Sequence, residues 1–120
     1  MTTDPAAEPL LPAEYVALTS AVLDSVEATT DQWLEDGVID IDAHRTGGLL
    51  ELTLPNRSKL IINTQPPLQE LWLAARAGGF HFKFVHSVWR DTKDNREFFE
   101  ALSVCASAQS GQNLRFVQSN

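Results

Sequence analysis

The spacing of apolar residues changes twice along this chain, and these two changes constrain the fold more than any other feature. Residues 12–35 place apolar side chains three or four positions apart, which is the period of an amphipathic helix. Residues 39–90 alternate apolar and polar side chains between turns, as half-buried strands do. The helical period returns from about Asp94. We therefore predict a helix, a run of strands and a second helix.

Both predicted helices carry an apolar stripe and a terminal signal. Pro12 is typical of a first helical turn, and Gly111 is typical of the position just past a helix end. The stripe of the first helix consists of Tyr15, Leu18, Val22, Val26 and Trp33. The stripe of the second helix consists of Phe98, Leu102 and Cys105. These stripes are expected to face one core.

About six strands are predicted between the helices. The first has Ile39 and Ile41 inward with Asp40 and Asp42 outward, and we expect it at a sheet edge. The inward residues of the later strands are Leu50, Leu52, Leu54, Leu71, Leu73, Phe80, Phe82 and Phe84. Because strands and helices do not alternate, the fold class is α+β, a two-layer sandwich with two helices on one face of a mainly antiparallel sheet.

The chain is short enough for one domain. Its 120 residues, 43% of them hydrophobic, predict a single domain over residues 12–120 after a flexible tail at residues 1–11, and a monomer by default. No apolar run reaches the roughly 20 residues that span a bilayer, and the start does not resemble a signal peptide. A single cysteine, Cys105, agrees with a reducing compartment. We expect a cytoplasmic protein that is not membrane-bound.

Negative charge is concentrated in the first half of the sequence. Residues 1–51 contain eleven Asp and Glu but only Arg45 as a strong base, whereas residues 52–120 contain five acids and eight Lys and Arg. An acidic front of this kind repels nucleic acid and favours cations or a basic protein.

The densest group of chemically useful residues is a set of carboxylates that we call the acidic ridge. It consists of Asp24, Glu27, Asp31, Glu35, Asp36, Asp40 and Asp42. Carboxylates three or four positions apart on a helix lie close enough to share a cation. Oxygen ligands suit iron, Mg²⁺, Ca²⁺ and Mn²⁺, and on a convex surface they bind weakly. The alternative is a helix face that is simply solvated.

No pattern indicates catalysis. The histidines His44, His81 and His86 lack the helical i, i+4 spacing of a zinc site, and we place His44 in a turn. Cys105 falls in an apolar stripe and is interpreted as a core residue. A non-enzymatic protein is expected.

Trp72 is predicted to be exposed on the outer face of the sheet. Strand alternation places Leu71 and Leu73 inward, and Trp72 then shares the outer face with Asn63, Gln65 and Glu70. Tryptophan is common at the centre of protein interfaces, so these four residues are candidates for partner binding. The alternative is a Trp half-covered by a neighbouring loop.

Residues 62–84, INTQPPLQELWLAARAGGFHFKF, resemble the central signature of the frataxin family, and in particular its bacterial members. That signature is N-x-Q-x-P followed by an aliphatic residue, Trp and a glycine pair. The resemblance extends over about residues 14–116 and implies the α-β-α frataxin sandwich. One departure is Glu70, which stands where the family usually has Gln.

The resemblance implies a protein that binds iron and regulates iron–sulfur cluster assembly by contacting a cysteine desulfurase and a scaffold protein. Residues implied for iron are Asp24, Glu27, Asp31, Asp36, Asp40 and Asp42, and those implied for partners are Asn63, Gln65 and Trp72. Two alternatives remain: ferroxidase activity on iron-dependent oligomers, and a metal-independent adaptor that acts through Trp72.

Overall fold

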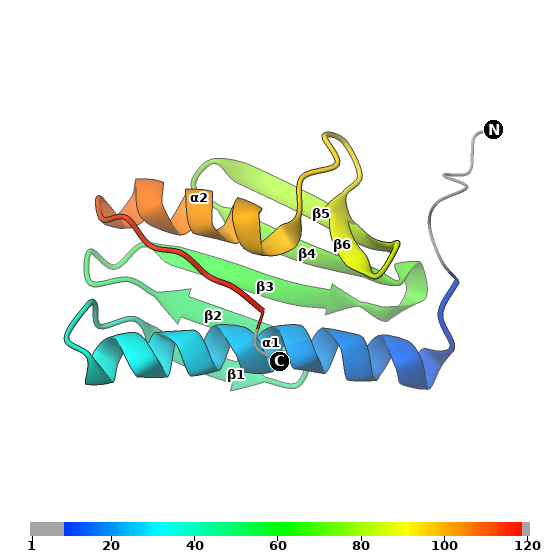
Figure 1. Ribbon diagram of the computed structural model, residues 1–120, viewed down its shortest axis with the longest axis horizontal. Helices are drawn as coiled ribbons and strands as arrows, with labels where there is room; N and C mark the ends of the chain where they lie inside the picture. The colour runs from blue at the N-terminus through cyan, green and yellow to red at the C-terminus, as the bar shows by residue number, and fades with distance from the viewer. Residues whose placement is uncertain (1–8, 119–120) are drawn as a thin grey trace.

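The computed structural model describes residues 9–118 and has two layers, with both helices on one face of a six-stranded sheet (Figure 1). The elements in chain order are α1 (Pro12–Glu35), β1 (Asp42–Thr46), β2 (Leu49–Thr53), β3 (Lys59–Gln65), the 3₁₀ turn η1 (Pro66–Leu68), β4 (Glu70–Ala75), β5 (Gly78–Val85), β6 (Val88–Asp91) and α2 (Phe98–Ser110). The predicted fold class is confirmed. Residues 1–8 of the predicted tail lie outside the described residues.

The sheet is an antiparallel meander with the strand order β1-β2-β3-β4-β5-β6. The turn between β1 and β2 consists of Gly47 and Gly48, and each position requires glycine for its own reason. Gly47 has a φ of 57°, in the left-handed region, and a Cβ on Gly48 would lie 2.0 Å from Thr64 Oγ1. The lack of a Cβ at Gly48 allows this close approach to β3, where the Gly48 carbonyl accepts from the Thr64 N–H at 2.9 Å.

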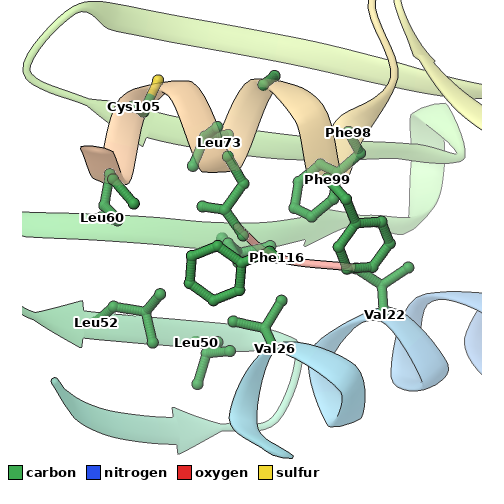
Figure 2. Packing of buried hydrophobic residues seen from close by; sticks show 14 of the residues in the cluster. Val22, Val26, Leu50, Leu52, Leu60, Leu73, Phe98, Phe99, Cys105 and Phe116 are labelled. Carbon is green, nitrogen blue, oxygen red and sulfur yellow. The ribbon is translucent and has the colours of Figure 1, made fainter. Parts of the chain in front are cut away.

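Every second residue of the central strands points into the core between the sheet and the helices. On the sheet side, the fully buried residues include Leu50, Leu52, Leu60, Ile62, Leu71 and Phe82. Val22 and Val26 from α1, and Phe98 and Leu102 from α2, fill the other side. Figure 2 shows several of these side chains converging on Phe116. The alternate residues of each strand therefore face outward.

Two predicted boundaries are wrong. β1 begins at Asp42, so Ile39 and Asp40 belong to the connection after α1, although β1 is an edge strand as predicted. α2 begins at Phe98 because Glu97 is its N-cap: the Glu97 carboxylate accepts hydrogen bonds from the Phe99 and Glu100 N–H groups. The residues before it form a turn in which the Asp91 carboxylate accepts from the Lys93 N–H. His44 lies in β1, not in a turn.

An extended segment after α2, residues 112–118, was not predicted, and it runs between the two helices (Figure 1). Its Leu114 and Phe116 are buried. Ser107 Oγ and Ser103 Oγ each accept a hydrogen bond from the backbone N–H of this segment, at 3.0 Å from Leu114 and 2.8 Å from Phe116. The spacing of two serines one helical turn apart on α2 thus matches the spacing of alternate residues in an extended chain.

Tyr15 joins α1 to the connection between β3 and β4. Its hydroxyl accepts from Gln65 N–H at 2.9 Å and donates to the Glu70 carbonyl at 2.5 Å. Just before α1, the Leu10 N–H donates to Gln69 Oε1 at 3.0 Å, and Gln69 Nε2 donates to the Leu10 carbonyl. The helix start therefore holds the residues that lead into β4.

Replacing Tyr15 with Phe is expected to lower the free energy of unfolding by about 1–2 kcal/mol, because two backbone groups lose their partner. Burial raises the pKa of the Tyr15 hydroxyl, so its contribution is fully present below pH ~10 and is lost as the pH rises through the folded pKa. The deficit of Tyr15→Phe should therefore shrink above pH 10. Urea unfolding at pH 7 and at alkaline pH measures both effects.

The matched control is Thr46→Val, which removes an exposed hydroxyl with one 3.4 Å contact to His44 Nε2. Its stability should change by less than about 0.5 kcal/mol. An equal loss in both variants would contradict the bridging role of Tyr15.

Candidate functional site

The acidic ridge is divided by the structure into residues with and without a basic partner. Asp31, Glu35, Asp36 and Asp40 are exposed, and no ion pair with them occurs within residues 9–118. The Asp36 carboxylate does accept a hydrogen bond from Gln32 Nε2 at 3.0 Å. Four carboxylates at the end of α1 and in the following connection are thus left open to a cation.

Arg45 forms ion pairs with two other carboxylates of the ridge. Its Nη1 lies 2.6 Å from Asp24 Oδ1 and 2.7 Å from Glu27 Oε1. These two hydrogen bonds raise the pKa of the Arg45 guanidinium. The side chain of Glu27 is 33% exposed and is partly shielded beside β1, whereas that of Asp24 is 69% exposed and lies mostly in solvent.

Asp42 lies on a different face from the helix carboxylates. It is in register with Thr53 at the start of β1, and the alternate residues Ala43 and Arg45 are the ones that face α1. The structure thus brings Asp31, Glu35 and Asp36 together on α1 and its end, but turns Asp42 toward the outer side of the sheet edge.

The donor chemistry of the ridge fits a weakly held cation and not a closed cage. No group of three His, Cys, Asp or Glu side chains within the described part of the chain converges as a metal site. The open carboxylates supply only oxygen ligands, and an ion bound to them would keep much of its water. Iron delivered to such a surface would be cargo that exchanges readily.

The outer face of the sheet carries the predicted partner-binding residues. Asn63, Trp72 and His81 are cross-strand neighbours on β3, β4 and β5. The Trp72 and His81 rings are stacked, with centroids 4.1 Å apart and planes 5° apart. Gln65 and Glu70 form the next cross-strand pair on the same face.

Trp72 is half-buried, which corrects the prediction that it is exposed. Its indole Nε1–H donates to Glu70 Oε1 at 2.8 Å, and His81 covers one ring face. Glu70 itself is 9% exposed. In these two contacts, the tryptophan is covered by its own sheet neighbours.

The partners of these candidate residues were not predicted from the sequence. Arg45 is the one strong base among the first 51 residues, which was a usable signal for an ion pair with the ridge. His81 and Lys83 alternate with the inward phenylalanines of β5, which indicates the outer face, but the antiparallel register that puts them beside Trp72 and Glu70 has no signal in the sequence.

Comparison with known proteins decides the family. The family model described as a frataxin-like domain matches residues 8–112. The chain belongs to the frataxin family. Within the described residues of this frataxin-family chain, no helix has the length and apolar character needed to cross a membrane.

Bacterial relatives cover most of this frataxin-family chain. It is 52% identical over 103 residues to the iron-sulfur cluster assembly protein CyaY of a Polaromonas species, covering 86% of this chain and 89% of the relative. It is 48% identical over 103 residues to the protein of the same name from Burkholderia mallei, covering 86% and 94%.

Solved structures agree with the fold. The frataxin of Psychromonas ingrahamii matches with a TM-score of 0.78 and 30% identity over 90% of this chain and 99% of that one. A trimeric frataxin from Saccharomyces cerevisiae, solved in complex with ferrous iron, matches with a TM-score of 0.64 over 90% and 93%. At 20% identity, the yeast structure shows a shared fold alone.

Replacing Arg45 with Gln should strengthen cation binding on the ridge several-fold, because it frees Asp24 and Glu27 and removes a positive charge from beside them. Broadening of α1 amide NMR signals by Mn²⁺ measures this effect. Arg76→Gln, in the turn between β4 and β5, removes the same charge elsewhere and should leave α1 unchanged. Equal gains in both variants would mean that net charge alone governs binding.

Proposed function

We propose that this protein acts in iron–sulfur cluster assembly as a non-enzymatic regulator that binds iron weakly on the acidic ridge. In this proposal the ridge also docks to a basic surface of a cysteine desulfurase, and the outer sheet face around Trp72 docks to the scaffold protein. The names of the bacterial relatives support the pathway. The observation that carries the iron proposal is the run of exposed carboxylates at Asp31, Glu35, Asp36 and Asp40, which have no cationic partner within residues 9–118.

Electrostatic repulsion gives the reason why such a surface attracts iron or a basic partner. Like charges one helical turn apart destabilise a helix by a few tenths of a kcal/mol per pair, and a bound cation relieves this cost. Asp31 and Glu35 have this spacing on α1. Asp24 and Glu27 already have Arg45, so we assign iron first to the unpaired end of the ridge.

The double variant Asp31→Asn/Glu35→Gln tests this proposal. We expect it to lose most of the broadening that Fe²⁺ causes in α1 amide signals under anaerobic conditions, and to bind the cysteine desulfurase less tightly at low salt. The attraction is Coulombic, so the wild-type affinity should also fall as salt rises above about 0.1 M. NMR titration with Fe²⁺, with and without the desulfurase, measures both.

The control Asp94→Asn/Glu100→Gln removes the same charge from two exposed positions outside the ridge. Its Fe²⁺ broadening and desulfurase affinity should match the wild type. If the ridge variant also matches the wild type, the ridge is a solvated surface and the iron proposal fails. Oxygen consumption recorded during the aerobic titration tests the ferroxidase alternative.

A metal-independent adaptor is the second candidate, and the stacked Trp72–His81 pair on the outer face favours it. Under this alternative, Trp72→Ala should weaken scaffold capture at least about tenfold, as loss of an interface tryptophan commonly does. Capture by the wild type should be unaffected by EDTA. Surface plasmon resonance with immobilised scaffold protein measures both. Binding that needs iron and survives Trp72→Ala would contradict the adaptor role.

A further inference from the structure

The carboxylate of Glu70 is buried among groups that donate hydrogen bonds or carry positive charge. Its side chain is 11% exposed. Oε1 accepts the Trp72 indole N–H at 2.8 Å and lies 3.6 Å from His81 Nδ1, while Oε2 lies 3.3 Å from Lys83 Nζ. The Glu70 backbone is also held, because its carbonyl accepts from Tyr15. Both its main chain and its side chain are therefore fixed.

The geometry of the two rings shows how the indole stands on the sheet. Trp72 and His81 are directly opposite each other on β4 and β5, where Cβ atoms lie about 4.5–5.5 Å apart. Their rings are parallel with centroids 4.1 Å apart, so both rings project from the sheet side by side. A partner would meet the solvent-facing edges of the two rings, and the rotation of the indole decides which of its atoms the partner meets.

We propose that Glu70 is a positioning residue that fixes this rotation and so prepares Trp72 for docking. Glu70 lies two residues before Trp72 on β4, on the same face, and its hydrogen bond to Nε1 selects one of the two ring orientations about the side-chain axis. An indole ordered on folding loses no rotational freedom on binding. The inference rests on the proposed docking of the scaffold protein through Trp72.

A purely structural role for Glu70 would be to neutralise Lys83 within the sheet. The two roles differ in what Gln can replace. Glu70→Gln keeps an acceptor for the Trp72 indole but removes the charge, whereas Glu70→Leu removes both. If Glu70 positions Trp72, then Gln preserves the indole hydrogen bond. If Glu70 acts only on Lys83, then Gln and Leu behave alike.

The first measurement uses the free protein and the Trp72 indole N–H signal in ¹H–¹⁵N NMR, assigned with Trp72→Phe. We expect Glu70→Leu to accelerate hydrogen exchange of this group about tenfold, and Glu70→Gln less than about threefold, because a charge-assisted hydrogen bond is lost in one and replaced by a neutral one in the other. An unchanged indole signal in Glu70→Leu would overturn the inference.

The matched control is Glu51→Leu. Glu51 is a carboxylate on the same outer face, and it pairs with Lys59 at a distance of 2.5 Å and not with Trp72. It should leave the indole exchange unchanged. If Glu51→Leu accelerates the exchange as much as Glu70→Leu does, general loosening of the sheet explains the result and the inference is wrong. Glu70→Gln keeps the comparison decisive if Glu70→Leu fails to fold.

The second measurement is scaffold binding by surface plasmon resonance. We expect the dissociation constant to rise about tenfold in Glu70→Leu and less than about threefold in Glu70→Gln, the same order as the exchange effects. If Glu70→Leu accelerates indole exchange but leaves the dissociation constant for scaffold unchanged, the positioning role is overturned. If the wild type itself fails to bind scaffold, the proposed docking fails, while the indole exchange still decides whether Glu70 holds Trp72.

Discussion

Side-chain alternation in a sheet covered on one face is the constraint on which the rest of this structure depends. Leu71 and Leu73 are buried against the helices, so Trp72 must project from the opposite face. The same rule on β5 buries Phe82 and sends His81 and Lys83 outward. Antiparallel register then brings these residues together, because Trp72 faces His81 and Glu70 faces Lys83. The polar cluster is thus a consequence of how the core is packed.

Alternation at the edge strand explains why the acidic ridge is divided. Ala43 and Arg45 are the residues of β1 that face α1. A charged residue pointing inward is tolerated at a sheet edge, where it stays near solvent, and here Asp24 and Glu27 satisfy it. The middle of α1 is therefore joined to the sheet by ion pairs. The carboxylates at the helix end, beyond the reach of Arg45, have no ion-pair partner in the described part of the chain.

Much of this arrangement was predictable, because long periodic segments report burial directly. The stripe of α1 and the inward residues of the central strands followed from period alone. The boundaries at Asp42 and Phe98 did not, because local hydrogen bonds decide such boundaries, as those to the Glu97 carboxylate do at the start of α2. The C-terminal segment was missed because Leu114 and Phe116 have too little periodic context. Half-burial of Trp72 was missed because it depends on register between strands.

The two candidate surfaces differ in whether their carboxylates are paired with a positive charge. On the outer face, the Glu70 carboxylate is matched within 4 Å by Lys83, so its field is largely cancelled at a distance and its effect is confined to contact. Asp31 and Glu35 near the end of α1, and Asp40 in the connection after it, form no ion pair among residues 9–118. Their electric field therefore extends into solvent over about a Debye length. The ridge is therefore suited to attracting cations and basic surfaces from solution. In the proposed function, the Trp72 face would instead recognise its partner by shape once the two are in contact.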